Sequence, residues 1–210
     1  IEFNDFIFKD IKFTSLEINS FTDSILNLSL SLGEVKNKGL LELNNLLLST
    51  NLSNNTIDFN LGWFKDDSSN TGDFDLSLFF ESEDSIIFSL NRGNLSSSNL
   101  GSWKWGDSTN CFIKNGEAFI EKMTVSNNNQ VISLYGDIGF SKKDIFKIEL
   151  DKINLNNLTS FYNIEDEIDI NGILDANIQL SSLLGVTGFS SKILLDSTQI
   201  NDYAIGKFNF

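Results

Sequence analysis

The sequence predicts an all-β protein built as an antiparallel meander sheet, with at most one or two short helices. Apolar and polar residues alternate with a period of two along most of the chain, turn residues separate the alternating runs, and long helical patterns are absent. With 210 residues, of which 40% are hydrophobic, the chain is long enough to bury a sizeable core. We expect about a dozen strands, spaced roughly 8–12 residues apart.

Alternating runs in the first half of the chain predict strands at residues 26–32, 57–63, 74–80 and 86–90. In a strand, successive side chains project to opposite faces, so each run has one apolar face and one polar face. Strands of this kind belong to antiparallel sheets with one solvated face, and not to parallel sheets that helices cover on both sides.

Asn115 and Gly116 predict a two-residue hairpin, because both tolerate the positive φ that a type I′ turn requires. In that register Lys114 faces Glu117, and opposite charges at this pair favour the pairing. The same register predicts the following pairs: Ile113 with Ala118, and Phe112 with Phe119.

The rest of the chain continues the alternation, with strands expected at residues 132–138, 146–150 and 174–180. Residues 155–162 favour a short helix, because apolar residues recur there at i, i+3 and i+6. Clusters of Asp, Asn, Ser and Gly predict loops at the following positions: 66–72, 91–94 and 127–129.

Composition excludes several classes of function. The chain has 15 Lys and Arg against 29 Asp and Glu, so it lacks the basic face that nucleic-acid binding requires. The absence of His removes the usual general base near neutral pH and the commonest metal ligand. A single Cys forms no internal disulfide. The chain has no run of 18 apolar residues, so the sequence predicts no membrane-spanning helix.

Acidic residues gather twice without matching a site. The loop at 66–73 does not fit an EF-hand, because its sixth and twelfth positions are Thr71 and Ser77 instead of Gly and Glu. Glu81 and Glu83 would project from one face of a strand, where they keep an edge soluble. We therefore predict a solvated loop and a solvated strand face at these two places.

The three Trp residues and the single Cys favour packing over chemistry. Trp103 and Trp105 would share one strand face, and with Trp63 they are interpreted as large apolar side chains of the sheet interior, with carbohydrate stacking as the alternative. Cys111, next to Phe112, is interpreted as a small apolar residue, because the chain offers no His or second Cys to activate it. We predict that the chain is not an enzyme and that it binds no cofactor or metal ion.

The order of motifs over residues 100–210 resembles the TamB family, the translocation and assembly module subunit, in its Bacteroidota-like form. The order of motifs runs through an apolar-x-apolar-x-Gly-x-apolar strand at 132–138, I-x-L-x-x-L at 153–158, and G-x-L-x-A at 172–176. Further segments that carry the likeness lie at residues 116–127, 144–150 and 193–208. Before residue 100, the chain resembles the family only in its alternation of apolar and polar residues.

The resemblance implies an elongated, curled antiparallel sheet that leaves an open apolar trough of the β-taco kind. It implies a large periplasmic protein, anchored in the inner membrane, that supports phospholipid transport to the outer membrane and protein assembly there. Phospholipid and an outer-membrane assembly protein of the TamA type are the partners implied. Because the chain begins at Ile1, we expect residues 1–210 to be one stretch of a longer trough. The sequence pattern changes weakly near residues 95–110.

Periodicity alone does not distinguish the open trough from a closed barrel or sandwich. The alternative function is a structural or adhesive module, a β-sandwich or β-solenoid, of a large surface protein. In the trough, one apolar face would line a groove for acyl chains. The residues predicted to line it are Ile57, Phe59, Leu61, Trp63, Phe74, Leu76, Leu78, Phe80, Ile132, Leu134, Phe146, Ile148, Ile178 and Leu180.

Overall fold

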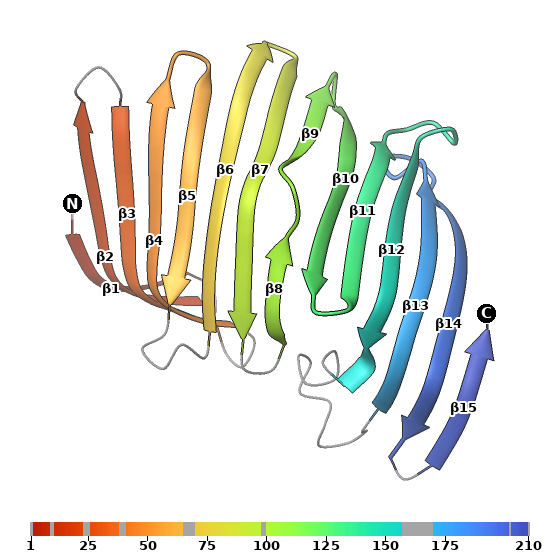
Figure 1. Cartoon of the computed structure of the whole chain (residues 1–210). Helices are drawn as coiled ribbons and strands as arrows, with labels where there is room; N and C mark the ends of the chain where they lie inside the picture. Colours follow the sequence, from red (N-terminus) through yellow and green to blue (C-terminus); the bar gives the residue numbers. More distant parts are fainter. Residues whose placement is uncertain are drawn as a thin grey trace. The chain divides into compact units, whose positions relative to one another are not determined.

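The computed structural model describes residues 2–8, 11–22, 26–37, 41–64, 70–97, 100–156, 170–201 and 203–209. The chain divides into two compact units, Ile1–Ser98 and Asn99–Phe210. Every regular element that Figure 1 labels is a β-strand, and each strand pairs antiparallel with its neighbours. The predicted all-β meander is therefore confirmed.

The first unit is a meander in which each strand pairs with the next one in sequence. Its strands are β1 (Glu2–Phe8), β2 (Ile11–Thr22), β3 (Leu26–Asn37), β4 (Leu41–Ser53), β5 (Thr56–Phe64), β6 (Asn70–Ser82) and β7 (Ser85–Ser97). Two-residue turns at Asn54–Asn55 and Glu83–Asp84 join β4 to β5 and β6 to β7. The prediction that Glu81 and Glu83 share one strand face is therefore wrong, because Glu83 is a turn residue.

The second unit is a meander with a divided first strand. It contains β8 (Gly101–Trp105), β9 (Thr109–Lys114), β10 (Glu117–Asn127), β11 (Gln130–Ile138), β12 (Ile145–Asn154), β13 (Ile170–Ser181), β14 (Gly188–Ile200) and β15 (Tyr203–Asn209). Strand β9 pairs with the first part of β10 and β8 with its last part, and β10 to β15 follow in sequence order.

The hairpin at Asn115 and Gly116 forms as predicted. The two residues have φ angles of 53° and 79°, and Lys114 lies opposite Glu117. Ile113 pairs with Ala118, and Phe112 pairs with Phe119. The predicted turn near residue 128 is also present, because Asn127 pairs with Gln130 across two turn residues.

Two predicted irregular segments differ in the structure. Residues 91–94 lie inside β7, where Arg92 pairs with Asp75 and Leu90 with Leu76, so that Asn91 is the extra residue of a bulge. Residues 70–72 begin β6, while residues 65–69 lie outside the described residues. Of the predicted helix at 155–162, Leu155 and Asn156 have helical backbone, and the remainder lies outside the described residues.

A bend crosses three neighbouring strands of the first unit at one level. Ser15 and Asn45 have positive φ angles of 51° and 47°, and the register places Gly33 of β3 between them. The side-chain amide of Asn45 donates to the carbonyl oxygen of Phe64 over 3.3 Å. Figure 1 shows that β2, β3 and β4 are curved in their lower parts. We call this line the bend.

Bulges and the bend preserve the apolar side of each sheet. In β3 the buried apolar residues flanking the bend are Leu32 and Val35, so the alternation moves by one residue at Gly33. In β10 the register shifts between Ile120 and Met123. In β12 it shifts between Leu150 and Ile153, where the backbone N–H of Lys152 donates to Asp175 Oδ1 over 2.8 Å. The extra residue in the β10 and β12 bulges restores the alternation, so that apolar side chains on both sides of each bulge project to one face.

Candidate functional site

One face of the first unit is apolar across its strands. Residues directly opposite in an antiparallel pair project to the same face. The register joins Ile18, Leu30, Leu48, Leu61 and Phe74 into one row that crosses β2 to β6. Neighbouring rows contain Leu28, Phe59, Leu76 and Leu90, and then Leu26, Leu52, Ile57, Leu78 and Phe88. We call this side the first apolar face.

The second unit has a comparable face. Its central row is Met123, Leu134, Ile148 and Ile178, on four successive strands. The rows beside it contain Val125, Ile132, Leu150, Ala176 and Ile193, and then Ile120, Phe146, Leu180 and Phe189. Trp105 pairs with Val125 and joins this side, which we call the second apolar face.

The predicted lining residues lie on these faces. Within the first unit the eight predicted residues from Ile57 to Phe80 share the first apolar face, and within the second unit the six from Ile132 to Leu180 share the second. None of them is buried: Phe80 is 37% exposed and the other thirteen are half-buried. Inner residues of a face-to-face sandwich would be covered by the opposing sheet.

Neither apolar face contains a charged side chain in its described rows. The polar exceptions on the first face include Thr50, which pairs with Leu28 and Phe59, and Ser20, which pairs with Leu28. On the second face Ser191 pairs with Ile178. Asp, Glu, Lys and Arg of the paired strands project to the opposite faces or lie at bulges and strand ends.

Trp63 lies flat on the first apolar face. Its ring stacks on Phe74 with centroids 5.6 Å apart and an interplanar angle of 19°. Its Nε1–H donates to Asn70 Oδ1 over 3.1 Å. The indole covers Gly72, its register partner on β6, because a Cβ at that glycine would overlap the ring. The ring therefore fills the space that the missing side chain leaves.

Cys111 belongs to the second apolar face, where it pairs with Ile120. It is a free, half-buried thiol, and burial raises its pKa above the ordinary value of 9.0. A raised pKa lowers the fraction of reactive thiolate at neutral pH. This agrees with a packing role for the side chain.

The opposite face of the second unit has a polar cluster. The Tyr135 hydroxyl donates to Glu149 Oε1 over 2.7 Å, and Lys122 Nζ donates to Glu149 Oε2 over 3.2 Å. The ammonium groups of Lys122 and Lys147 lie 5.4 and 5.5 Å from the centroid of the Tyr135 ring. The hydrogen bond between the Tyr135 hydroxyl and the Glu149 carboxylate raises the pKa of Tyr135 and lowers the pKa of Glu149.

The opposite face of the first unit has an ion-pair cluster. Arg92 Nε lies 2.8 Å from Asp75 Oδ2, and Arg92 Nη2 lies 3.1 Å from Asp73 Oδ2. All three side chains are at least partly exposed, so the pairs contribute little to the free energy of folding. Their charges mark this face as the solvated one.

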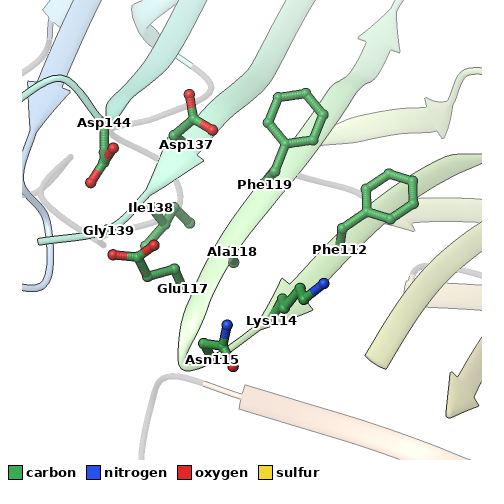
Figure 2. A pocket seen from close by; sticks show the side chains of 10 residues that line it. All are labelled: Phe112, Lys114, Asn115, Glu117, Ala118, Phe119, Asp137, Ile138, Gly139 and Asp144. Carbon is green, nitrogen blue, oxygen red and sulfur yellow. The ribbon is translucent and has the colours of Figure 1, made fainter. Parts of the chain in front are cut away.

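A shallow hollow of about 280 Å³ lies beside the β9–β10 hairpin, on the opposite face of the second unit (Figure 2). The rings of Phe112 and Phe119 stack there with centroids 6.3 Å apart. Glu117, Asp137 and Asp144 also line it. Among the residues that the structure describes, no group of three or more His, Cys, Asp or Glu is arranged to hold a metal ion.

Sequence reasoning left several members of the two faces out of the site. Leu28, Leu30 and Leu48 belong to the first face, and Met123 and Val125 to the second. Leu28 and Leu30 belong to an alternating run and could have been included, whereas Leu48 stands in a run of three leucines whose phase the sequence does not give. Met123 follows the β10 bulge, and the phase of the alternation across a bulge has to be known before such residues can be assigned to a face.

No protein-family model, curated protein or solved structure matches the chain. In the described part of the chain, no helix has the length and hydrophobicity needed to cross a membrane.

Proposed function

We propose that the chain is a stretch of a lipid conduit whose apolar faces shield acyl chains from water. In this proposal it belongs to a TamB-like protein of the periplasm, anchored to the inner membrane. That protein would support phospholipid transport to the outer membrane and protein assembly there with a partner of the TamA type. The chain is proposed to act by binding and guiding, without catalysis or a cofactor.

One observation carries the proposal: each unit presents rows of half-buried apolar side chains that contain no charge. An exposed apolar surface of more than a few hundred Å² is uncommon on a soluble monomer and marks an interaction site. An acyl chain gains about 0.8 kcal/mol for each CH₂ that leaves water, without any directional contact. Rows of Leu, Ile and Phe would therefore hold an acyl chain in many nearly equivalent positions, which favours movement along the face.

The test places one charge in the middle of each face. We expect the purified chain to carry phospholipid that mass spectrometry detects, and Leu76→Glu and Leu134→Glu to reduce the bound lipid at least tenfold. An uncovered face leaves the new carboxylate access to water, so both variants should keep their β-sheet circular dichroism. The matched controls are Ser29→Glu and Gln179→Glu, which introduce the same charge on the opposite faces and should retain lipid.

The alternative, a packed structural or adhesive module, predicts a different result. If the faces were covered and dry, burying a carboxylate there would cost several kcal/mol and unfold the unit. A parent chain without lipid, together with melting temperatures that collapse in Leu76→Glu and Leu134→Glu but not in the controls, would reject the conduit.

A further inference from the structure

Exposure on the first apolar face falls steadily along the strands toward the bend. On β3, Leu26 is 43% exposed and Leu28 is 40% exposed, Leu30 is half-buried, and Leu32 is 8% exposed. These four side chains alternate along one strand and share the face. The face is therefore wet at one end of β3 and dry at the other.

Neighbouring strands repeat the gradient. Leu52 of β4, whose partner is Leu26, is 40% exposed, whereas Leu46 and Leu48 nearer the bend are half-buried. On β2, Ser20 and Thr22 at the same end as Leu26 are exposed, whereas Ile18, nearer the bend, is half-buried. The gradient thus belongs to the face and not to one strand.

The bend explains the dry end. Where β2, β3 and β4 turn at Ser15, Gly33 and Asn45, the alternation changes phase, so that Leu32 before the bend and Val35 after it are both buried. At the other end of the strands, the turns Asn54–Asn55 and Glu83–Asp84 place exposed polar groups beside Leu52 and Phe80.

We propose that an acyl chain on this face lies along the strands, with its methyl end at the bend and its head group at the Asn54 and Glu83 turns. This inference rests on the proposed function and adds a direction to it. The driest part of the face receives the end of the lipid that has no polar group, and the exposed end leaves the head group in water.

The dimensions agree with this orientation. Leu26 and Leu32 are six residues apart, which corresponds to about 20 Å of strand. The hydrocarbon core of a bilayer is about 30 Å thick, so each leaflet contributes chains of about 15 Å. One membrane acyl chain therefore fits between the turns and the bend.

Trp63 is a natural reporter for the methyl end. The Asn45 side chain binds the carbonyl of Phe64, so Trp63 lies one residue from the level of the bend. Replacing Trp103 and Trp105 by Phe leaves Trp63 as the single tryptophan, which is excited selectively at the red edge of its absorption. A second reporter, Leu28→Trp with all three native Trp replaced by Phe, places the indole at the exposed end of the same face.

The experiment uses vesicles of phosphatidylcholine that carries two bromines either near the methyl end or near the carboxyl end of one acyl chain. We expect bromines near the methyl end to quench Trp63 at least twofold more strongly than bromines near the carboxyl end, and the order to reverse for the Leu28→Trp reporter. Equal quenching by the two lipids, or the opposite order, would overturn the orientation while lipid binding stands. No quenching of either reporter by either lipid would overturn the proposed function as well.

Discussion

The indole of Trp63 occupies the space that a side chain at Gly72 would need, on the neighbouring strand of the first apolar face. Such pairing of an aromatic ring with a strand glycine supplies packing where the glycine has none. The stacking on Phe74 and the hydrogen bond to Asn70 hold the ring in that position.

Gly72→Ala should therefore destabilise the first unit by about 1–3 kcal/mol, because the new methyl group forces the indole off its site. Gly62→Ala is the matched control, since a Cβ there would meet only the carbonyl oxygen of Gly72 at 3.6 Å, an ordinary contact. Urea unfolding followed by Trp fluorescence measures both variants. Equal stability of the two would show that the ring is not tied to the glycine.

The β9–β10 hairpin allows a test of backbone conformation. Gly116 has φ 79°, and a Cβ there would meet no atom within 4 Å, so strain alone opposes a side chain. We expect Gly116→Ala to cost about 1–2 kcal/mol in the free energy of unfolding. Asn115→Gly, which keeps positive φ accessible at the other turn residue, should change stability by a few tenths of that amount. A neutral Gly116→Ala would contradict the observed turn.

The Tyr135–Glu149 hydrogen bond predicts two pH-dependent effects on stability. The pKa of Glu149 is lowered in the folded chain, so its contribution is present above the unfolded pKa near 4.5 and is lost as pH falls through the lower folded value. The pKa of Tyr135 is raised from 10.0, so its contribution is present below pH 10 and is lost as pH rises through the higher folded value.

Tyr135→Phe removes the shared hydrogen bond and should flatten both effects. Thermal melting of the parent and the variant between pH 3 and pH 11 measures the difference, with Tyr203→Phe as the control, because Tyr203 is an exposed tyrosine on β15. If the melting temperatures of the parent and Tyr135→Phe differ by the same amount at every pH, the hydrogen bond does not couple to protonation.

Cys111 should react slowly with a thiol reagent at pH 8, because burial raises its pKa and only the thiolate attacks. Phospholipid vesicles should slow the reaction further by covering the second apolar face. The comparison is Gln179→Cys in a Cys111→Ser background, which places the thiol on the opposite, exposed face. Equal protection of both thiols by lipid would show that lipid does not choose the apolar face.

The residues that alternate without interruption could be assigned from the sequence, and those next to an irregularity could not. The run from Ile57 to Trp63 is predicted as a strand with one apolar face, and the Asn115–Gly116 turn is predicted with its pairing, because both depend on local chemistry. Residues 91–94 were predicted as a loop, because Asn and Gly favour turns and bulges alike. Only pairing with Asp75 and Leu76 on β6 distinguishes the two.

The same limit applies to the apolar faces. Ile120 and Met123 lie three residues apart and project to one side only because the β10 bulge separates them. The exposure gradient toward the bend depends on three strands bending at one level, which no single run of residues reveals. Side-chain periodicity therefore predicts the strands that alternate without interruption and their apolar sides, whereas the bend and the bulges require the register between strands.

The extensive contacts among the described strands join only neighbours within a sheet, such as β6 with β7 or β13 with β14. Folding free energy in such a meander is a sum of local terms, as in repeat proteins, in which each unit depends on the units beside it. A hairpin could then be inserted or deleted between two strands without repacking distant ones. Evolution can adjust the reach of this architecture in steps of two strands, and damage to one strand would spread only as far as its neighbours.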